Sequence, residues 1–231
     1  MFEYPPDVHQ HSGTQPGLAI ALEGLPNYPG THTNTSLTAH SNRKDFFTVR
    51  YIQNHEIGQQ QFVGEHLGVK YHARREKYSP DEVAGHLAQG NVKFAILDTL
   101  NWPYWQPSDY FDLVLEFPAV VFLLAHSGGI QIGDFMPGLM FSNCYFDFSM
   151  TSVFFGLDDQ DSPRYSQQVF EACSTLSRHP MTRNRLLFGS DEPFFSRELT
   201  QQAYLNVGAT GEQLRQNYGQ MINKIRKSNE K

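Results

Sequence analysis

Two histidines near the start of the chain, His9 and His11, are separated by a single residue. If this segment is a β-strand, both imidazoles lie on one face of it, because side chains alternate between the two faces with period two. Neutral imidazole is the commonest protein ligand for zinc and related metals, so the pair can fill two adjacent positions around one ion. Two ligands do not make a site, and two exposed histidines near a chain terminus would show the same spacing.

Further side chains that can bind a metal stand at or just past the ends of short apolar runs. The run 93–98 closes on a carboxylate, and the run 119–126, the most apolar of the chain, closes on a histidine. The residues in question are His72, Asp98, His126 and Asp191. Taken singly, His126 is equally well explained as a core histidine bonded to a backbone carbonyl, and Asp191 as a helix cap. Taken together with His9 and His11, they favour a common site.

The elements that would bring these residues together follow from the alternation of apolar runs with turn signals and helical periodicity. Strands are expected in a first run ending at His11 and then at 18–22, 46–52, 68–72, 93–98, 119–126, 144–148 and 185–191. Helices are expected at 79–89, where Ser79 is the predicted N-cap, and at 108–116, 165–177 and 211–227. Residues 23–42 are rich in Gly, Pro, Asn, Thr and Ser and are expected to form a long loop.

Eight strands separated by helices or long loops favour an α/β fold, a compact (β/α)8 TIM barrel, as one domain over residues 1–231. An open doubly wound sheet is the alternative, although no Gly-x-Gly-x-x-Gly follows any expected strand. In a (β/α)8 barrel the active site lies at the carboxyl ends of the strands. The polar residues named above would therefore meet at one mouth of the barrel.

Composition narrows the class of protein. The 231 residues carry a net charge of -6, and their Lys and Arg side chains are scattered, which gives little support to nucleic-acid binding. No apolar run approaches the roughly 20 residues of a membrane span, and the first residues do not resemble a signal peptide. A cytoplasmic protein without nucleic-acid or membrane partners is expected. Its two cysteines, Cys144 and Cys173, are expected to be reduced and buried.

Four segments, in chain order, resemble the amidohydrolase superfamily. They are Asp-x-His-x-His at 7–11, Gly-x-Lys-x-His at 68–72, an apolar run leading into Ala-His-x-Gly-Gly at 117–129, and Phe-Gly-Ser-Asp-x-Pro within 185–193. The similarity points to the amidohydrolase-related branch, which includes aminocarboxymuconate-semialdehyde decarboxylase and several lactone and dicarboxylate hydrolases. The resemblance implies a TIM barrel, one divalent metal ion, with zinc first, and a homodimer.

The resemblance also implies roles for individual residues. His9 and His11 would be metal ligands, Asp191 a ligand or general base, and His126 the histidine beside the metal that polarises or protonates the substrate. Asp98 stands where the family usually has a further histidine ligand. A carboxylate there can bind metal, and it makes the site harder, which favours manganese or iron beside zinc. The same substitution is also compatible with a barrel that has lost its metal and its activity.

Substrate-binding residues are expected close to these ligands. On a strand over 68–72, Lys70 and His72 share one face, and Lys70 is also the residue that a carboxylated, two-metal site would use. Arg74, with Arg75, offers a guanidinium fork for a substrate carboxylate, unless both are solvated loop charges. Trp102 could form part of an apolar wall of the site or pack against another subunit.

These expectations define a function. A metal-activated water would attack the carbonyl of a small-molecule substrate, a carboxylate-bearing ester, lactone or amide, with Asp191 and His126 as the catalytic residues. The alternatives are a metal-dependent decarboxylase of the same superfamily and a degenerate, non-catalytic barrel that serves as a binding protein.

Overall fold

The computed structural model describes residues 6–10, 19–23, 46–57, 68–89, 92–100, 104–150, 163–191 and 196–227. These residues contain one eight-stranded sheet in which each strand pairs in parallel with the next along the chain. The strands are β1 Asp7–Gln10, β2 Ala19–Glu23, β3 Phe46–Tyr51, β4 Gly68–Tyr71, β5 Phe94–Asp98, β6 Val121–Ala125, β7 Cys144–Asp147 and β8 Leu186–Leu187. All eight expected strands are present.

The sheet closes on itself between its first and last strands. Asp7 at the start of β1 forms a parallel bridge with Phe188, just after β8, and the Val8 N–H donates to the Phe188 carbonyl at 2.9 Å. Strand order 1 to 8 with this closure is that of a (β/α)8 barrel, which confirms the predicted fold. The prediction extended the eighth strand over 185–191, whereas β8 has two residues and the chain leaves the sheet before Asp191.

The barrel has an inner and an outer apolar layer, and alternate residues of a strand enter different layers. In β6, Val121, Leu123 and Ala125 pack with the inner cluster, whereas Phe122 and Leu124 pack outward against the helices. Both faces of the strand are therefore buried, which is why its sequence is apolar throughout. Cys144 and Cys173 are buried free thiols in the outer layer, as expected.

The helices cover the outer face of the sheet and one end of it. They are α1 Ala73–Glu76, α2 Pro80–Ala88, α3 Pro107–Glu116, α4 Ile132–Phe135, α6 Pro163–Arg178, α7 Arg197–Asn206 and α8 Gly211–Lys227. α2, α3, α6 and α8 confirm the four expected helices. The Ser79 hydroxyl caps α2 by accepting from the Glu82 N–H, as its position in the sequence predicted. α7 was not expected. The described residues also contain short 3-10 helices, η2 Asn54–Glu56, η3 His126–Gln131, η4 Met136–Met140 and η5 Arg183–Arg185.

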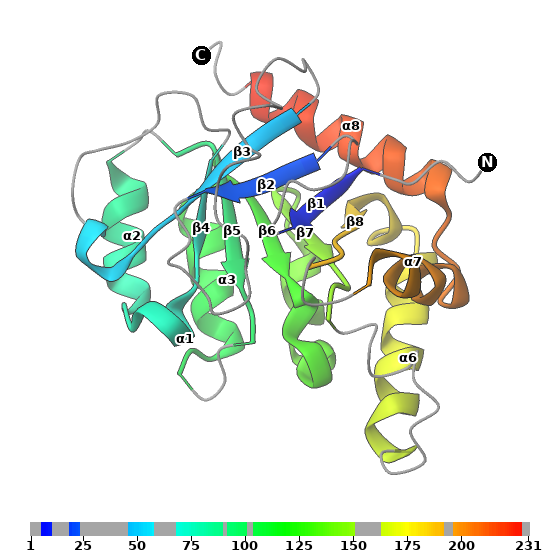
Figure 1. Ribbon diagram of the computed structural model, residues 1–231. Helices are drawn as coiled ribbons and strands as arrows, with labels where there is room; N and C mark the ends of the chain where they lie inside the picture. The colour runs from blue at the N-terminus through cyan, green and yellow to red at the C-terminus, as the bar shows by residue number, and fades with distance from the viewer. Residues whose placement is uncertain are drawn as a thin grey trace.

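α8 closes the end of the barrel at which the strands begin. Tyr218, Met221, Ile222 and Ile225 of α8 join the inner apolar cluster. The Asn217 side-chain amide donates to the Leu186 carbonyl at the start of β8, and Figure 1 shows α8 crossing this end of the sheet. The opposite end, where the strands finish, is left for a site. Among the described residues no helix is long and apolar enough to cross a membrane.

Candidate active site at the carboxyl ends of the strands

Strand alternation places three charged side chains inside the barrel, near the strands' carboxyl ends. Lys70 in β4 lies between two residues of the outer layer, and Asp147 at the end of β7 does the same. Asp98 ends β5 directly after Leu97, which also faces outward. Lys70, Asp98 and Asp147 are almost completely buried, with exposed fractions of 1%, 2% and 0%. These charges therefore interact in a dry environment, where electrostatic forces are strong.

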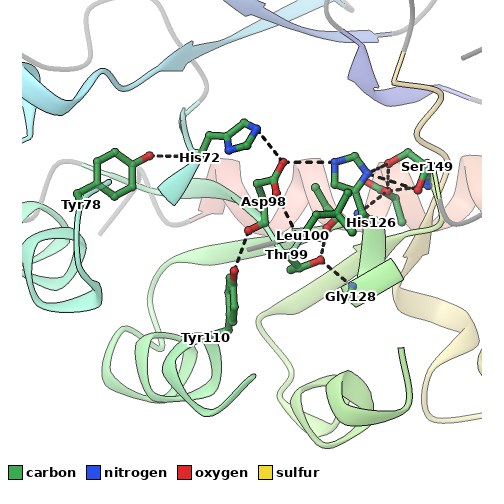
Figure 2. A network of polar contacts seen from close by, with 11 residues as sticks. His72, Tyr78, Asp98, Thr99, Leu100, Tyr110, His126, Gly128 and Ser149 are labelled. Carbon is green, nitrogen blue, oxygen red and sulfur yellow. Dashed lines mark hydrogen bonds and ion pairs between the residues drawn. The ribbon is translucent and has the colours of Figure 1, made fainter. Parts of the chain in front are cut away.

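The Asp98 carboxylate lies between two imidazoles. Its Oδ2 atom is 3.3 Å from Nε2 of His72, which follows β4, and 3.4 Å from Nε2 of His126, which follows β6. Figure 2 shows the three side chains in a row, with Asp98 in the centre. Its Oδ1 atom accepts from the Leu100 N–H at 3.1 Å, so the carboxylate has a fixed orientation. The structure thus brings together three of the residues that the sequence singled out.

His126 opens a segment of unusual backbone. His126, Ser127, Gly128 and Gly129 all have positive φ, at 68°, 47°, 80° and 59°. The left-handed conformation costs a non-glycine residue roughly 1–2 kcal/mol, so other contacts must hold it. The Thr99 hydroxyl accepts from the Gly128 N–H at 2.7 Å, and the Ser127 hydroxyl donates to the Asp147 carbonyl. A side chain at Gly128 would overlap the Phe135 ring, since a Cβ there would lie 2.2 Å from it.

Asp147 and Ser149 are site residues that sequence reasoning missed. Asp147 Oδ1 accepts from the backbone N–H groups of His126 at 3.0 Å and Ser149 at 2.9 Å, and also from the Ser149 hydroxyl. The same hydroxyl lies 2.9 Å from Nδ1 of His126. A signal was available for Asp147, because it is a carboxylate at the end of an otherwise apolar strand, as Asp98 is.

The imidazoles and Lys70 control the ionisation of Asp98. Burial opposes ionisation, but His72, His126 and Lys70 together hold the pKa of the Asp98 carboxyl well below its usual range. Burial also disfavours the charged form of His126. Its hydrogen bond to Asp98 and the negative charges of Asp191, Asp98 and Asp147 outweigh that effect and raise the pKa of His126. Asp98 is therefore an anion at neutral pH.

The pKa values of His72 and Lys70 are lowered instead of raised. Burial lowers the pKa of His72 to about 4, with Asp98 opposing the shift and Lys70 and Arg74 adding to it. Burial also lowers the pKa of Lys70, against the opposing charges of Asp98, Asp191 and Asp147. His72 is thus a neutral imidazole at pH 7, the form that binds metals.

Asp191 completes the group from the far side of the barrel. It follows β8 with φ 61° and is 6% exposed. Its neighbour Ser190 donates both its N–H, at 3.1 Å, and its hydroxyl, at 2.5 Å, to the Asp7 carboxylate. Asp7 in turn forms an ion pair with Arg197 of α7, Nε to Oδ2 at 3.8 Å, and both side chains are buried. This clamp of Asp7, Ser190 and Arg197 fixes the backbone that presents Asp191.

The remaining predicted site residues are placed in part or not at all. His9 lies in β1, where the pairing with β2 shifts register between Asp7 and Gln10, and its side chain is outside the description. His11 and Trp102 also lie outside the described residues. Arg74 is exposed in α1, within electrostatic reach of His72.

The donor chemistry of the mouth suits a divalent cation. It combines a neutral imidazole, His72, with an anionic carboxylate, Asp98. In the described part of the chain no group of three or more His, Cys, Asp or Glu side chains is arranged to hold a metal ion. A complete ligand set would therefore include side chains outside the described residues, where the predicted ligands His9 and His11 lie.

Comparison with solved structures supports the fold. An uncharacterized TIM-barrel protein from Bordetella bronchiseptica matches with a TM-score of 0.58 at 13% identity, over 90% of this chain and 78% of that one. An amidohydrolase from Burkholderia multivorans, crystallised with bound zinc, matches with a TM-score of 0.57 at 13% identity, over 90% and 82%.

A third match is to a candidate 2-pyrone-4,6-dicarboxylic acid hydrolase from Pseudomonas putida, with a TM-score of 0.58 at 11% identity, over 97% and 99% of the two chains. No protein-family model and no curated protein sequence matches the chain. At these identities the solved structures establish that the chain has the TIM-barrel fold, and the site must carry the argument for function.

Proposed function

We propose that the protein is a metal-dependent hydrolase of a small ester, lactone or amide that carries a carboxylate. The observation that carries the proposal is the charge of the barrel mouth. Three buried carboxylates, Asp98, Asp147 and Asp191, act on a single buried ammonium, Lys70. Even when Lys70 and His126 are both charged, the three carboxylates leave a net negative charge among these groups. Buried charge that is not balanced is costly, and a divalent cation is the ligand that would balance it.

His9, His11, Asp98 and Asp191 would hold the ion, with zinc first and manganese or iron as alternatives. When bound, a divalent cation supplies Lewis acidity, which polarises a carbonyl and acidifies water. Asp191, presented by the clamp of Asp7, Ser190 and Arg197, would accept a proton from the attacking water and pass it to the leaving group. His126 in its charged form would donate a hydrogen bond from Nε2 to the oxyanion that develops on the substrate.

The substrate class follows from the cations around the mouth. Lys70 is surrounded by three carboxylates, so its charge serves mainly to balance the site. Arg74 is exposed two residues after His72, and we assign it to a substrate carboxylate, for which a guanidinium is the best-matched partner. The solved structures of similar fold include a zinc-bound amidohydrolase and a candidate dicarboxylate hydrolase, which is consistent with this class. Decarboxylation of such a substrate remains the alternative reaction.

Turnover of a panel of carboxylate-bearing lactones and esters tests the proposal. We expect hydrolysis that is lost after chelation and restored by zinc, manganese or iron. Asp191→Asn, which preserves shape and removes the base, should lower kcat at least 100-fold, in the range typical of general-base catalysis. Full activity in Asp191→Asn would refute the role of Asp191. A panel without turnover, together with no metal binding, would favour the non-catalytic barrel.

A further inference from the structure

The Nδ1 atom of His126 faces two oxygen atoms of a single residue, Ser149. The Ser149 hydroxyl is 2.9 Å from Nδ1, and the Ser149 carbonyl oxygen is 3.4 Å away. His126, Ser149 and Asp147 are 3%, 0% and 0% exposed, so bulk water does not compete for these contacts. The other ring nitrogen, Nε2, faces Asp98 and the mouth of the barrel. Figure 2 shows the ring between these two groups of partners.

The direction of these hydrogen bonds follows from the chemistry of the partners. A carboxylate only accepts, and the Ser149 hydroxyl has one proton, which it donates to Oδ1 of Asp147. Toward His126 the hydroxyl can then only accept. The Ser149 carbonyl oxygen also only accepts. Both partners of Nδ1 therefore require that Nδ1 carry a proton.

We propose that Asp147 and Ser149 are positioning residues that hold His126 in the tautomer with its proton on Nδ1. When the ring is charged, Nε2 donates to Asp98, 3.4 Å away. When the ring is neutral, the shorter contact at Nδ1, 2.9 Å from the Ser149 hydroxyl, keeps the proton there, and Nε2 faces Asp98 and the mouth without a proton. The neutral ring can accept a proton or bind a cation at Nε2. The consequence for catalysis rests on the proposed function, whereas the tautomer itself does not.

The same contacts exclude Ser149 as a nucleophile. Its hydroxyl is fully buried and is bonded to both Asp147 and His126, so it does not reach a substrate in the mouth. Asp147 also fixes the ring through the backbone, because it accepts from the His126 N–H at the start of the positive-φ segment. The two residues thus fix the position of the His126 ring and determine which of its nitrogens carries the proton. Hydrogen-bond partners behind the ligand histidines of metal sites have the same role in other proteins.

Two-bond ¹H–¹⁵N spectra of histidine-labelled protein measure the tautomer directly, at an alkaline pH where the ring is neutral. His126→Gln assigns the signals. We expect a protonated Nδ1 and a bare Nε2 for His126 in the parent protein. A proton on Nε2 in the parent would overturn the proposal without any variant. This readout needs neither substrate nor metal, so it is separate from the test of the hydrolase.

Two serine variants separate positioning from general loss of structure. Ser149→Ala removes the acceptor, and we expect the Nδ1 tautomer to be lost or mixed, with Ser149→Thr restoring it. Ser127→Ala is the matched control, because Ser127 is a buried hydroxyl of the same segment that bonds to the Asp147 carbonyl instead of the ring. It should leave the tautomer unchanged. A Ser149→Ala spectrum like that of Ser127→Ala would overturn the role of Ser149.

If turnover is found, the kinetic consequence can be measured. Ser149→Ala should lower kcat about 10- to 100-fold with little change in KM, the range seen when outer partners of site histidines are removed. Ser127→Ala should change kcat much less. Equal loss in both variants would show that only the folding of the segment matters and would contradict the proposed positioning.

Discussion

Two buried aspartates, Asp7 and Asp147, each hold the backbone next to a site residue that has positive φ, Asp191 and His126 respectively. Asp147 accepts the N–H of His126, and Asp7 accepts the N–H of Ser190, the residue before Asp191. Both carboxylates are 0% exposed, and in each case a serine hydroxyl donates to the carboxylate as well. The same arrangement, a buried aspartate that accepts from a backbone N–H and a serine hydroxyl, therefore occurs twice, between β6 and β7 and at the closure between β8 and β1.

The two aspartates differ in how their charge is balanced. Asp7 has a buried cation of its own, Arg197 of α7. Among the described residues, the hydrogen bonds to Asp147 come from two backbone N–H groups and the Ser149 hydroxyl. Its negative charge acts on the pKa of both Lys70 and His126. Asp7 should therefore matter mainly for stability. Asp147 should matter mainly for the electrostatics of the mouth.

The largest loss in the free energy of unfolding is expected for Asp7→Ala. Arg197 would be left as a buried cation without its carboxylate, a change that typically costs about 3–5 kcal/mol. Denaturant unfolding measures the loss, and the double variant Asp7→Ala/Arg197→Met should recover part of it. A loss below about 1 kcal/mol would show that the ion pair is not what stabilises the closure.

Asp147→Asn should destabilise the fold less, by about 2 kcal/mol, because the amide oxygen still accepts hydrogen bonds although the charge is lost. The same unfolding measurement compares it with Asp7→Asn. A greater loss for Asp147→Asn than for Asp7→Asn would contradict the contrast between the two aspartates.

The pH dependence sharpens the contrast. The folded-state pKa of His126 is above its ordinary value of 6.5, so its protonation stabilises the fold fully below pH 6.5. This contribution is lost as the pH rises through the folded-state pKa. Removing the negative charge in Asp147→Asn should lower the pKa of His126 and narrow that pH window, as NMR titration can measure. Asp7→Asn should leave the pKa of His126 close to its parent value.

Gly128→Ala tests the segment that Asp147 supports. The new Cβ would force the Phe135 ring to move and would sit at a φ of 80°, so a loss of about 1–2 kcal/mol is expected in thermal or denaturant unfolding. Gly85→Ala in α2, where a Cβ meets no atom within 4 Å, is the control and should be neutral or stabilising. Equal effects at both positions would contradict the tight packing described for Gly128.

The smallest effect is expected for Ser79→Ala, which removes the cap of α2 and should cost about 1 kcal/mol. α2 contains neither Asp7 nor Asp147, so the pKa of His126 should not change. If the pKa of His126 shifted in Ser79→Ala, that pKa would respond to any loosening of the barrel. A shift in Asp147→Asn could then not be assigned to the lost charge of Asp147.

Much of this barrel is predictable from local patterns, because strands buried on both faces have apolar sequences and α2 has a strong cap. α7 was missed for a physical reason. The residues that it buries include Arg197 and Thr200, so its apolar periodicity is weak, and the partner that makes the burial of Arg197 tolerable is Asp7, far away in the sequence. Local patterns cannot show such a pair.

The site was predictable where a polar residue ends an apolar run, as at Asp98 and His126. Asp147 follows the same pattern and could have been found by it. Ser149 could not, because its importance depends on the positive-φ turn that brings Nδ1 of His126 to it. The local sequence shows which polar residue ends a strand. The hydrogen-bond partners of that residue depend on the fold.

Calorimetric titration of zinc into chelator-treated protein tests most directly whether the negative charge of the mouth holds a cation. We expect about one equivalent to bind, no binding in Asp98→Asn, and affinity about tenfold weaker in Asp147→Asn, which removes charge without removing a proposed ligand. A parent protein that binds neither zinc, manganese nor iron, while remaining folded, would contradict the proposed metal site.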